Sequence, residues 1–167
     1  MRVTALNHVS IPAVDLEASK RFYTEVFGMD VLPAPNFGMN VVWLRIGNRQ
    51  IHLFETDTPP GGYQHLGMEV DDFEHAYRKL KEVTAFGGDD GYFGKMYVMP
   101  DGGVQMYFHD PAGNMLEIDH PSVDELDRDL FGDDLEVIVE LRHQTEENLR
   151  ASLWQHRDAE LTDRYAS

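Results

Sequence analysis

The chain has 167 residues, no cysteine and a formal net charge of −16. This length suits one compact domain or two small modules that share a core. Without cysteine, disulfides, thiolate metal ligands and cysteine nucleophiles are excluded. The negative charge repels phosphate backbones and anionic membranes, so we expect a small-molecule partner rather than a nucleic acid.

The N-terminal residues, MRVTALNHVS, do not combine a basic segment with a long apolar run, as a secretion signal would. The sequence also lacks the roughly eighteen consecutive apolar residues of a membrane-spanning helix. We therefore expect a soluble cytoplasmic protein that does not associate with a membrane.

The sequence repeats itself at an offset of 57 residues. With His8 aligned on His65, NHVSIPAVDLEASKRFY matches QHLGMEVDDFEHAYRKL. In each copy, the His opens a segment of alternating apolar positions that predicts a strand. Asp15 and Asp72 then mark the starts of two predicted helices, and Gly28 is placed to end the first helix.

Three extended segments follow each predicted helix. The first copy has them at 29–33, 40–46 and 50–55, and the second copy has them at 95–99, 103–109 and 115–119. Each copy is therefore a βαβββ module, and the Pro-Pro-Gly-Gly segment is the natural linker. We predict a first module at 1–58, a second at 63–120 and an acidic, mainly helical C-terminal extension at 121–167.

A single module would bury only one face of its sheet, so two modules are expected to pair face to face. The prediction is an α+β fold with a pseudo-twofold axis and a cleft lined by both modules. Equivalent residues of the two copies would then meet near this axis.

Four residues able to bind metal occupy symmetric positions in the repeat. His8 corresponds to His65 on the first strands, and His52 corresponds to Glu117 on the last strands. Imidazole and carboxylate are ligands of borderline and hard divalent metals. We predict one divalent ion (Fe, Mn, Ni, Co or Zn) at these four residues, with an acid–base role as the alternative for His52.

Three motifs, NHVSI, QHLGMEVDD and MYFHDPAGNMLEI, resemble the glyoxalase, bleomycin-resistance and extradiol-dioxygenase proteins of the vicinal oxygen chelate superfamily. The resemblance covers roughly residues 3–120 and implies a glyoxalase-like, half-open barrel. It also implies that His8, His65 and Glu117 bind a metal that chelates two neighbouring substrate oxygens. His52 departs from the family pattern, because glyoxalase-type and epimerase-type members place a Glu there as ligand and base.

Two further residues are candidate catalytic groups. Tyr107 matches the family Tyr whose hydroxyl reaches a metal-bound substrate oxygen, although a packed aromatic residue of a strand is an equal interpretation. His109 lies two residues further on, on the same predicted strand face, and could act as an acid–base group.

The function that we favour is a glyoxalase-type lyase or isomerase that acts on a small carbonyl or hydroxy-carbonyl substrate. An extradiol dioxygenase with Fe(II) is second, because residues 98–100 lack the acid–base His expected before Tyr107. A fosfomycin-type enzyme is third, since few cationic residues lie near the motifs. A drug-sequestering binding protein without catalysis is the alternative outside enzymes.

The extension is predicted to contain a short helix after Pro121, an apolar alternation at 135–141 and an amphipathic helix that starts at Thr145. Leu149, Leu153 and Trp154 form the apolar stripe of this last helix. We expect a homodimer to which the extension contributes.

Overall fold

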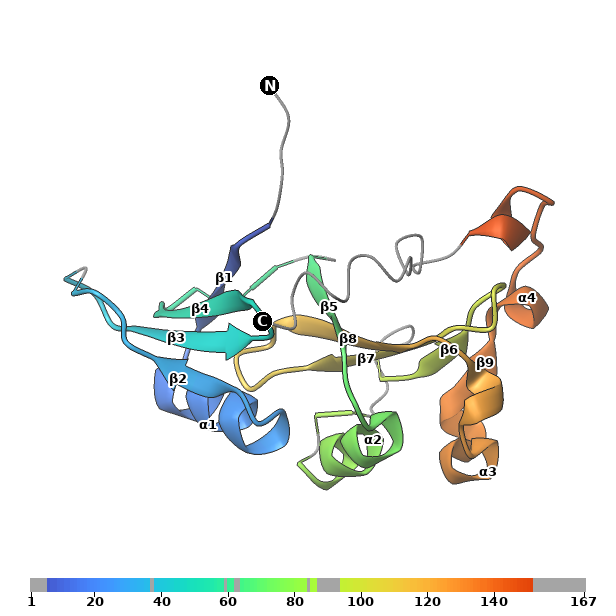
Figure 1. The fold of residues 1–167 in the computed structure, drawn as a ribbon, viewed down its shortest axis with the longest axis horizontal. Coiled ribbons are helices and arrows are strands. Elements are labelled where there is room, and N and C mark those ends of the chain that lie inside the picture. Colours follow the sequence, from blue (N-terminus) through green and yellow to red (C-terminus); the bar gives the residue numbers. More distant parts are fainter. Residues whose placement is uncertain are drawn as a thin grey trace. The chain divides into compact units, whose positions relative to one another are not determined.

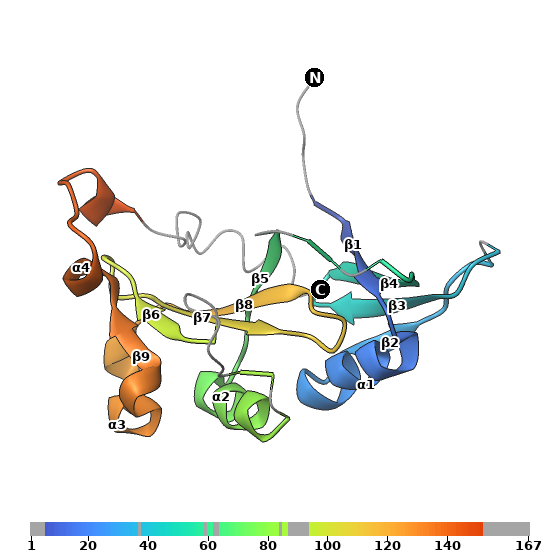
Figure 2. The same ribbon diagram turned by 180° about the vertical axis from the view of Figure 1, so that it is seen from behind.

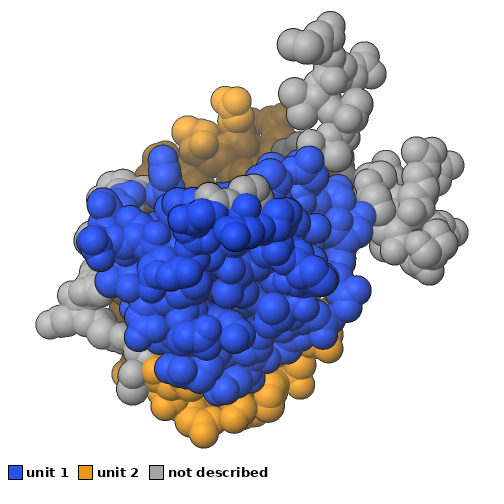
Figure 3. All heavy atoms as spheres, turned by 90° about the vertical axis from the view of Figure 1, so that its left-hand side faces the viewer, with its two compact units in different colours: residues 1–66, 109–116 blue, residues 67–108, 117–167 orange. Residues whose placement is uncertain are grey.

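The computed structural model describes residues 6–36, 38–58, 60–61, 64–83, 85–86 and 94–151. The chain divides into two compact units (Figure 3). Unit 1 contains residues 1–66 and 109–116, and unit 2 contains residues 67–108 and 117–167.

Unit 1 contains a four-stranded sheet with the order β1-β4-β3-β2. Strand β1 pairs parallel to β4, whereas β4 with β3 and β3 with β2 are antiparallel. Helix α1 lies against one face of this sheet (Figures 1 and 2). The bounds of these elements are β1 His8–Ala13, α1 Leu16–Val26, β2 Asp30–Leu32, β3 Val41–Ile46 and β4 Arg49–Glu55.

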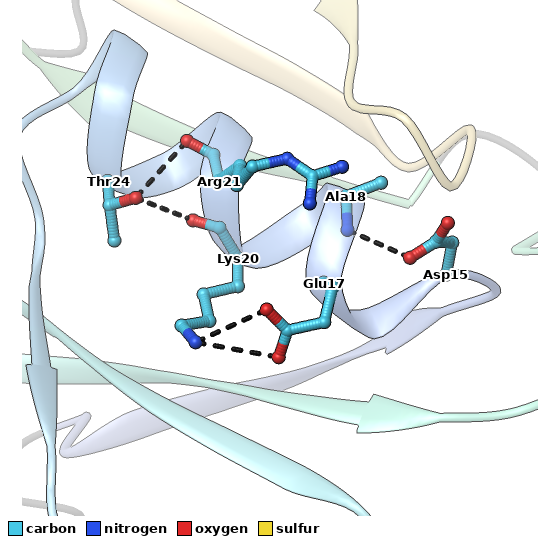
Figure 4. Close-up of polar contacts among 6 residues, drawn as sticks. All are labelled: Asp15, Glu17, Ala18, Lys20, Arg21 and Thr24. Atoms are coloured by element: carbon cyan, nitrogen blue, oxygen red, sulfur yellow. Dashed lines mark hydrogen bonds and ion pairs between the residues drawn. The ribbon is translucent and has the colours of Figure 1, made fainter.

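Helix α1 begins at the predicted residue. The Ala18 N–H donates to Asp15 Oδ1 at 2.8 Å, which satisfies one of the amides that the first turn leaves without a helical partner (Figure 4). Lys20 forms an ion pair with Glu17 at 3.3 Å on the exposed side of the helix. Gly28, with φ +61°, follows the last turn, and this backbone conformation favours glycine.

The segment 110–114 forms a turn between two extended segments of the second module. Asp110 Oδ1 accepts from the Ala112 and Asn114 amides at 2.9 and 2.8 Å, while its Oδ2 accepts from the Tyr23 hydroxyl at 2.9 Å. The Asn114 side chain donates to the Pro12 carbonyl at 2.8 Å. This turn is thus tied to both α1 and β1 within unit 1. Burial, reinforced by Asp110, raises the pKa of Tyr23 well above its usual value.

The second sheet has five strands in the order β5-β8-β7-β6-β9. Its first four strands repeat the order of the first sheet, so the structure confirms two βαβββ modules. Helix α2 begins as α1 does, with the His75 N–H donating to Asp72 Oδ1 at 2.8 Å. The bounds are β5 His65–Glu69, α2 Phe73–Glu82, β6 Met96–Val98, β7 Val104–His109 and β8 Met115–His120. How the two modules pair stays a prediction.

The described part of the C-terminal extension belongs to unit 2 and adds a strand to the five-stranded sheet. Strand β9 runs parallel to β6, with Leu135 opposite Met96. Phe131 is buried and meets the Tyr77 ring edge-on, with 5.1 Å between the ring centroids. The described elements are η1 Val123–Glu125, α3 Arg128–Phe131, η2 Gly132–Asp134, β9 Leu135–Val137, α4 Ile138–Leu141 and η3 Asn148–Arg150.

The predicted amphipathic helix is only partly described. Thr145 Oγ1 accepts from the Asn148 N–H at 3.2 Å, a contact across the turn at the predicted start of this helix. A short 3₁₀ turn follows, and Leu153 and Trp154 lie outside the described residues. Across the part of the chain that the structure describes, none of the helices has the length and apolar character needed to span a membrane.

Candidate metal centre

His8 is the first residue of β1, and its ring is exposed. Its Nδ1 lies 2.7 Å from Asn7 Oδ1, so Nδ1 carries the proton that it donates to this amide oxygen, and Nε2 keeps the lone pair. Histidines that bind metals commonly donate their other ring N–H in this way. The His8 ring is therefore in a tautomer suited to a metal ligand.

His52 lies between two other rings. The Trp43 and His8 rings stack on opposite sides of His52, each with a centroid separation of 4.3 Å, at interplanar angles of 7° and 14°. This stack forms because β4 lies between β3 and β1 in the sheet. The Nε2 atom of His52 is 2.8 Å from Gln50 Oε1. Burial lowers the pKa of His52, and the nearby His8 lowers it further.

The stacked geometry restricts what the two histidines can bind together. A metal lies in the plane of each imidazole that binds it, at about 2.0–2.1 Å from the nitrogen. Two rings that lie face to face and nearly parallel do not direct their in-plane lone pairs to one point. In this arrangement His8 and His52 cannot both bind one ion, which favours the acid–base role for His52.

His65 is the first residue of β5 and is placed differently. It borders a pocket of about 200 Å³ that lies within unit 1 between residues of β1 and the segments 60–61, 64–66 and 114–116. The polar part of the pocket lining comes from Ser10, Gln64, His65 and Asn114. Neither His8 nor His52 lines this pocket.

Glu117 lies in unit 2 on β8, where its side chain is only 4% exposed. The Gln105 side-chain amide donates to Glu117 Oε1 at 2.6 Å, and the Tyr107 hydroxyl donates to Gln105 Oε1 at 3.1 Å. These residues form a buried polar array on neighbouring strands β7 and β8. His109, at the end of β7, is half-buried and belongs to unit 1.

Asp119 is a second buried carboxylate on the face of β8 that holds Glu117. In the described part of the chain its Oδ1 is buried without a hydrogen-bond partner. Burial raises the pKa of Asp119, and the adjacent Glu117 carboxylate raises it further. Sequence analysis missed Asp119 and Gln105, although each lies two residues from a predicted site residue and therefore on the same strand face.

The predicted ligand set is not assembled as one cluster. Among the described residues of either unit, no three His, Asp or Glu side chains form a group able to hold a metal ion. His8, His52 and His65 belong to unit 1, and Glu117 belongs to unit 2. The donor chemistry nevertheless fits a divalent metal: His8 has a suitable tautomer, and one oxygen of the Glu117 carboxylate is fixed by Gln105. The ligand set stays a prediction.

Comparison with known proteins identifies relatives for about half of this chain. The mitochondrial methylmalonyl-CoA epimerase of Bos taurus is 35% identical over 92 residues, which is 46% of this chain and 53% of that protein. The ethylmalonyl-CoA/methylmalonyl-CoA epimerase of Cereibacter sphaeroides is 33% identical over 48% of this chain and 71% of that protein. This chain thus spans about half the length of the mitochondrial epimerase.

A solved structure also resembles this chain. A glyoxalase family protein from Bacillus anthracis superposes with a TM-score of 0.60 at 25% identity, covering 73% of this chain and all of that chain. The family model of the Glyoxalase/Bleomycin resistance protein/Dioxygenase superfamily matches residues 5–118, which is more than half of the sequence. This chain therefore belongs to the glyoxalase/bleomycin resistance protein/dioxygenase superfamily.

Proposed function

We propose that this chain is a divalent-metal-dependent isomerase that removes and returns a proton next to a chelated carbonyl. The observation that carries the proposal is the 33–35% identity to relatives named as epimerases of methylmalonyl-CoA and ethylmalonyl-CoA. The substrate class that follows is a malonyl thioester with an alkyl group on carbon 2. This proposed reaction is more specific than the glyoxalase-type lyase or isomerase activity expected from the sequence.

The reaction fits the donor groups of the candidate centre. The hydrogen on carbon 2 lies between a thioester carbonyl and a carboxylate, so the charge left by its removal spreads over neighbouring oxygens. A divalent metal, when bound, supplies positive charge that stabilises these oxygens. We assign the binding of this metal to His8, His65 and Glu117.

His52 is the base that we propose for proton removal. A general base must be unprotonated at the working pH, and the lowered pKa of His52 keeps its ring neutral. The Trp43 and His8 rings fix its plane, and Gln50 holds the proton on Nε2, so Nδ1 is the atom that accepts. Inversion at carbon 2 also needs a group that returns the proton from the opposite side, and His109 is the candidate.

The test combines metal analysis with isotope exchange. Purified protein is analysed for bound metal, and methylmalonyl-CoA of one configuration is then incubated with it in D₂O. We expect one metal per chain, deuterium at carbon 2 and loss of the original configuration, all abolished by a chelator. Metal-loaded protein that exchanges carbon 2 no faster than the chelated control would reject the proposal.

The same preparation distinguishes the other functions. Oxygen consumption with Fe(II) and a panel of catechols would support an extradiol dioxygenase instead. Protein that holds no stoichiometric metal, yet binds small hydrophobic drugs, would support the sequestering function.

A further inference from the structure

The buried side chains of Glu117, Gln105 and Tyr107 form a directed chain of hydrogen bonds. All three residues are at most 7% exposed, and the two hydrogen bonds measure 2.6 and 3.1 Å. They lie on adjacent strands β7 and β8 within unit 2. Buried polar groups of this kind are costly unless they are satisfied, so the array holds each side chain in one orientation.

The chemistry of the three groups fixes which end of the amide faces which partner. The Gln105 NH₂ donates to Glu117 Oε1, so the donor end of the amide faces the carboxylate. The Gln105 carbonyl oxygen then faces the other way and needs a donor, which the Tyr107 hydroxyl provides. The Tyr107 hydroxyl thereby stabilises the orientation in which the NH₂ faces Glu117, because a turned amide would direct its oxygen at the carboxylate.

We infer that Gln105 is a positioning residue that orients Glu117 for metal binding, and that Tyr107 acts through Gln105. This inference rests on the proposed function, because it takes Glu117 as a metal ligand. It gives the Tyr107 hydroxyl a role in place of the substrate contact that the family resemblance implied. Hydrogen-bond partners of metal ligands change metal affinity by about 10–100-fold when they are removed.

The direct test is the affinity for Co²⁺ alone, followed through its visible absorption and a competing chelator. Gln105→Met keeps the side-chain length and removes the amide, and we expect it to weaken Co²⁺ binding by about 10–100-fold. Tyr107→Phe should weaken binding by a smaller factor. In the double variant, Tyr107→Phe should add no further loss, because the residue through which it acts is already gone.

Two controls separate positioning from loss of structure. Tyr77→Phe removes another part-buried hydroxyl of unit 2, which donates to Asp134 at 2.8 Å, and it should leave Co²⁺ affinity unchanged. Thermal unfolding with a chelator present shows whether each variant is folded. If Gln105→Met fails to fold, Gln105→Asn replaces it: this variant keeps an amide that is too short to reach Glu117, and the same loss is expected.

The outcomes distinguish this inference from the proposed function. If Glu117→Gln leaves Co²⁺ affinity unchanged, Glu117 is not a ligand, and the metal site of the proposed function fails. If Glu117→Gln weakens binding while folded Gln105→Met does not, the inference is overturned and the metal site stands. An additive loss in the double variant would overturn the assigned role of Tyr107.

Discussion

Ser19 has a hydroxyl that the fold buries without using. Its side chain is 0% exposed in α1, and its Oγ has no hydrogen-bond partner among the described residues. A buried polar group without a partner costs roughly 1–3 kcal/mol, and alanine is also the better helix former. We predict that Ser19→Ala raises the free energy of unfolding by about 1 kcal/mol.

Urea denaturation measures this change, with an unaltered dependence on urea concentration as the sign that the unfolded state is the same. Ser10→Ala, at an exposed position of β1, is the matched control and should have little effect. A lower stability for Ser19→Ala would mean that its hydroxyl is used after all.

The stacked rings of His8 and His52 predict different consequences for the two substitutions. His8→Ala removes the imidazole whose tautomer suits a ligand, so the affinity for Co²⁺ should fall. His52→Ala should keep most of the Co²⁺ affinity but lower the turnover number by about 10²–10⁴-fold, the usual contribution of a general base. Parallel Co²⁺ titrations and exchange assays measure both effects. An equal loss of metal affinity in the two variants would show that both rings turn to bind the ion.

The positions of histidine and glutamate in the sequence repeat allowed part of the site to be predicted. The repeat identified His8, His52, His65 and Glu117, and the structure does bring two of them together. Strand β1 pairs parallel to β4 with Ser10 opposite His52. The His8 ring, two residues before Ser10 on β1, stacks on the His52 ring. The ring orientation could not be predicted, because it is fixed by Trp43, which β3 places opposite His52.

At the scale of elements, the repeat predicted both modules because its signals are local. Asp15 and Asp72 cap their helices by a hydrogen bond to an amide three residues later, a contact that the sequence contains in full. Strand β9 is different. Its apolar alternation was visible, but its pairing with β6 depends on Phe131 packing near residues of α2 that are distant in sequence. Such tertiary contacts have no local signal.

Asp134 joins the extension to α2, and its effect on stability should depend on pH. Its Oδ2 accepts from the Tyr77 hydroxyl at 2.8 Å and from Lys81 at 2.7 Å. Burial opposes its ionisation, but these donors and the charge of Lys95 outweigh burial, so the pKa of Asp134 is lowered. Its stabilising effect is therefore present above the ordinary Asp pKa of about 3.9 and is lost as the pH falls through the lowered value.

The contribution of the Tyr77 hydroxyl to stability depends on pH in the alkaline range. Burial and its hydrogen bond to Asp134 raise the pKa of Tyr77 to about 12. A group whose pKa is raised in the folded state stabilises the fold below its unfolded pKa of about 10, and this stabilisation is lost as the pH rises through the folded pKa.

We predict that Asp134→Asn lowers the free energy of unfolding by about 1 kcal/mol at pH 7 and that this loss declines below pH 4, measured by urea unfolding across pH.

Glu82→Gln is the matched control for Asp134→Asn. It breaks an exposed ion pair with Lys79 on the same helix, and such pairs contribute little to stability. An equal loss in both variants, or a cost of Asp134→Asn that does not change with pH, would contradict the assigned role of Asp134.

At the scale of the whole molecule, the extension bears on assembly. Phe131 and Asp134 are used within unit 2, so they are not available for contacts with another chain. Among the described residues of the extension, the exposed large apolar side chains are those of Val139, Leu141 and Leu149, which are 43%, 41% and 50% exposed. The homodimer expected from the sequence stays a prediction.

Metal binding should stabilise the whole chain if the proposed ligands are correct. A ligand that binds only the folded state adds about 2.7 kcal/mol at a hundred times its Kd, which raises Tm by roughly 5–10 °C in a chain of this size. We predict this rise with Co²⁺ for the natural sequence and its absence for Glu117→Gln. Differential scanning calorimetry with Co²⁺ or with EDTA provides the comparison.

The metal-free measurement is the control for this prediction. Glu117→Gln keeps the length of the side chain and has an amide oxygen able to accept from Gln105, so in EDTA the variant should unfold close to the temperature of the natural sequence. A variant that is less stable in EDTA yet still stabilised by Co²⁺ would show that Glu117 has a structural role and that the metal binds elsewhere.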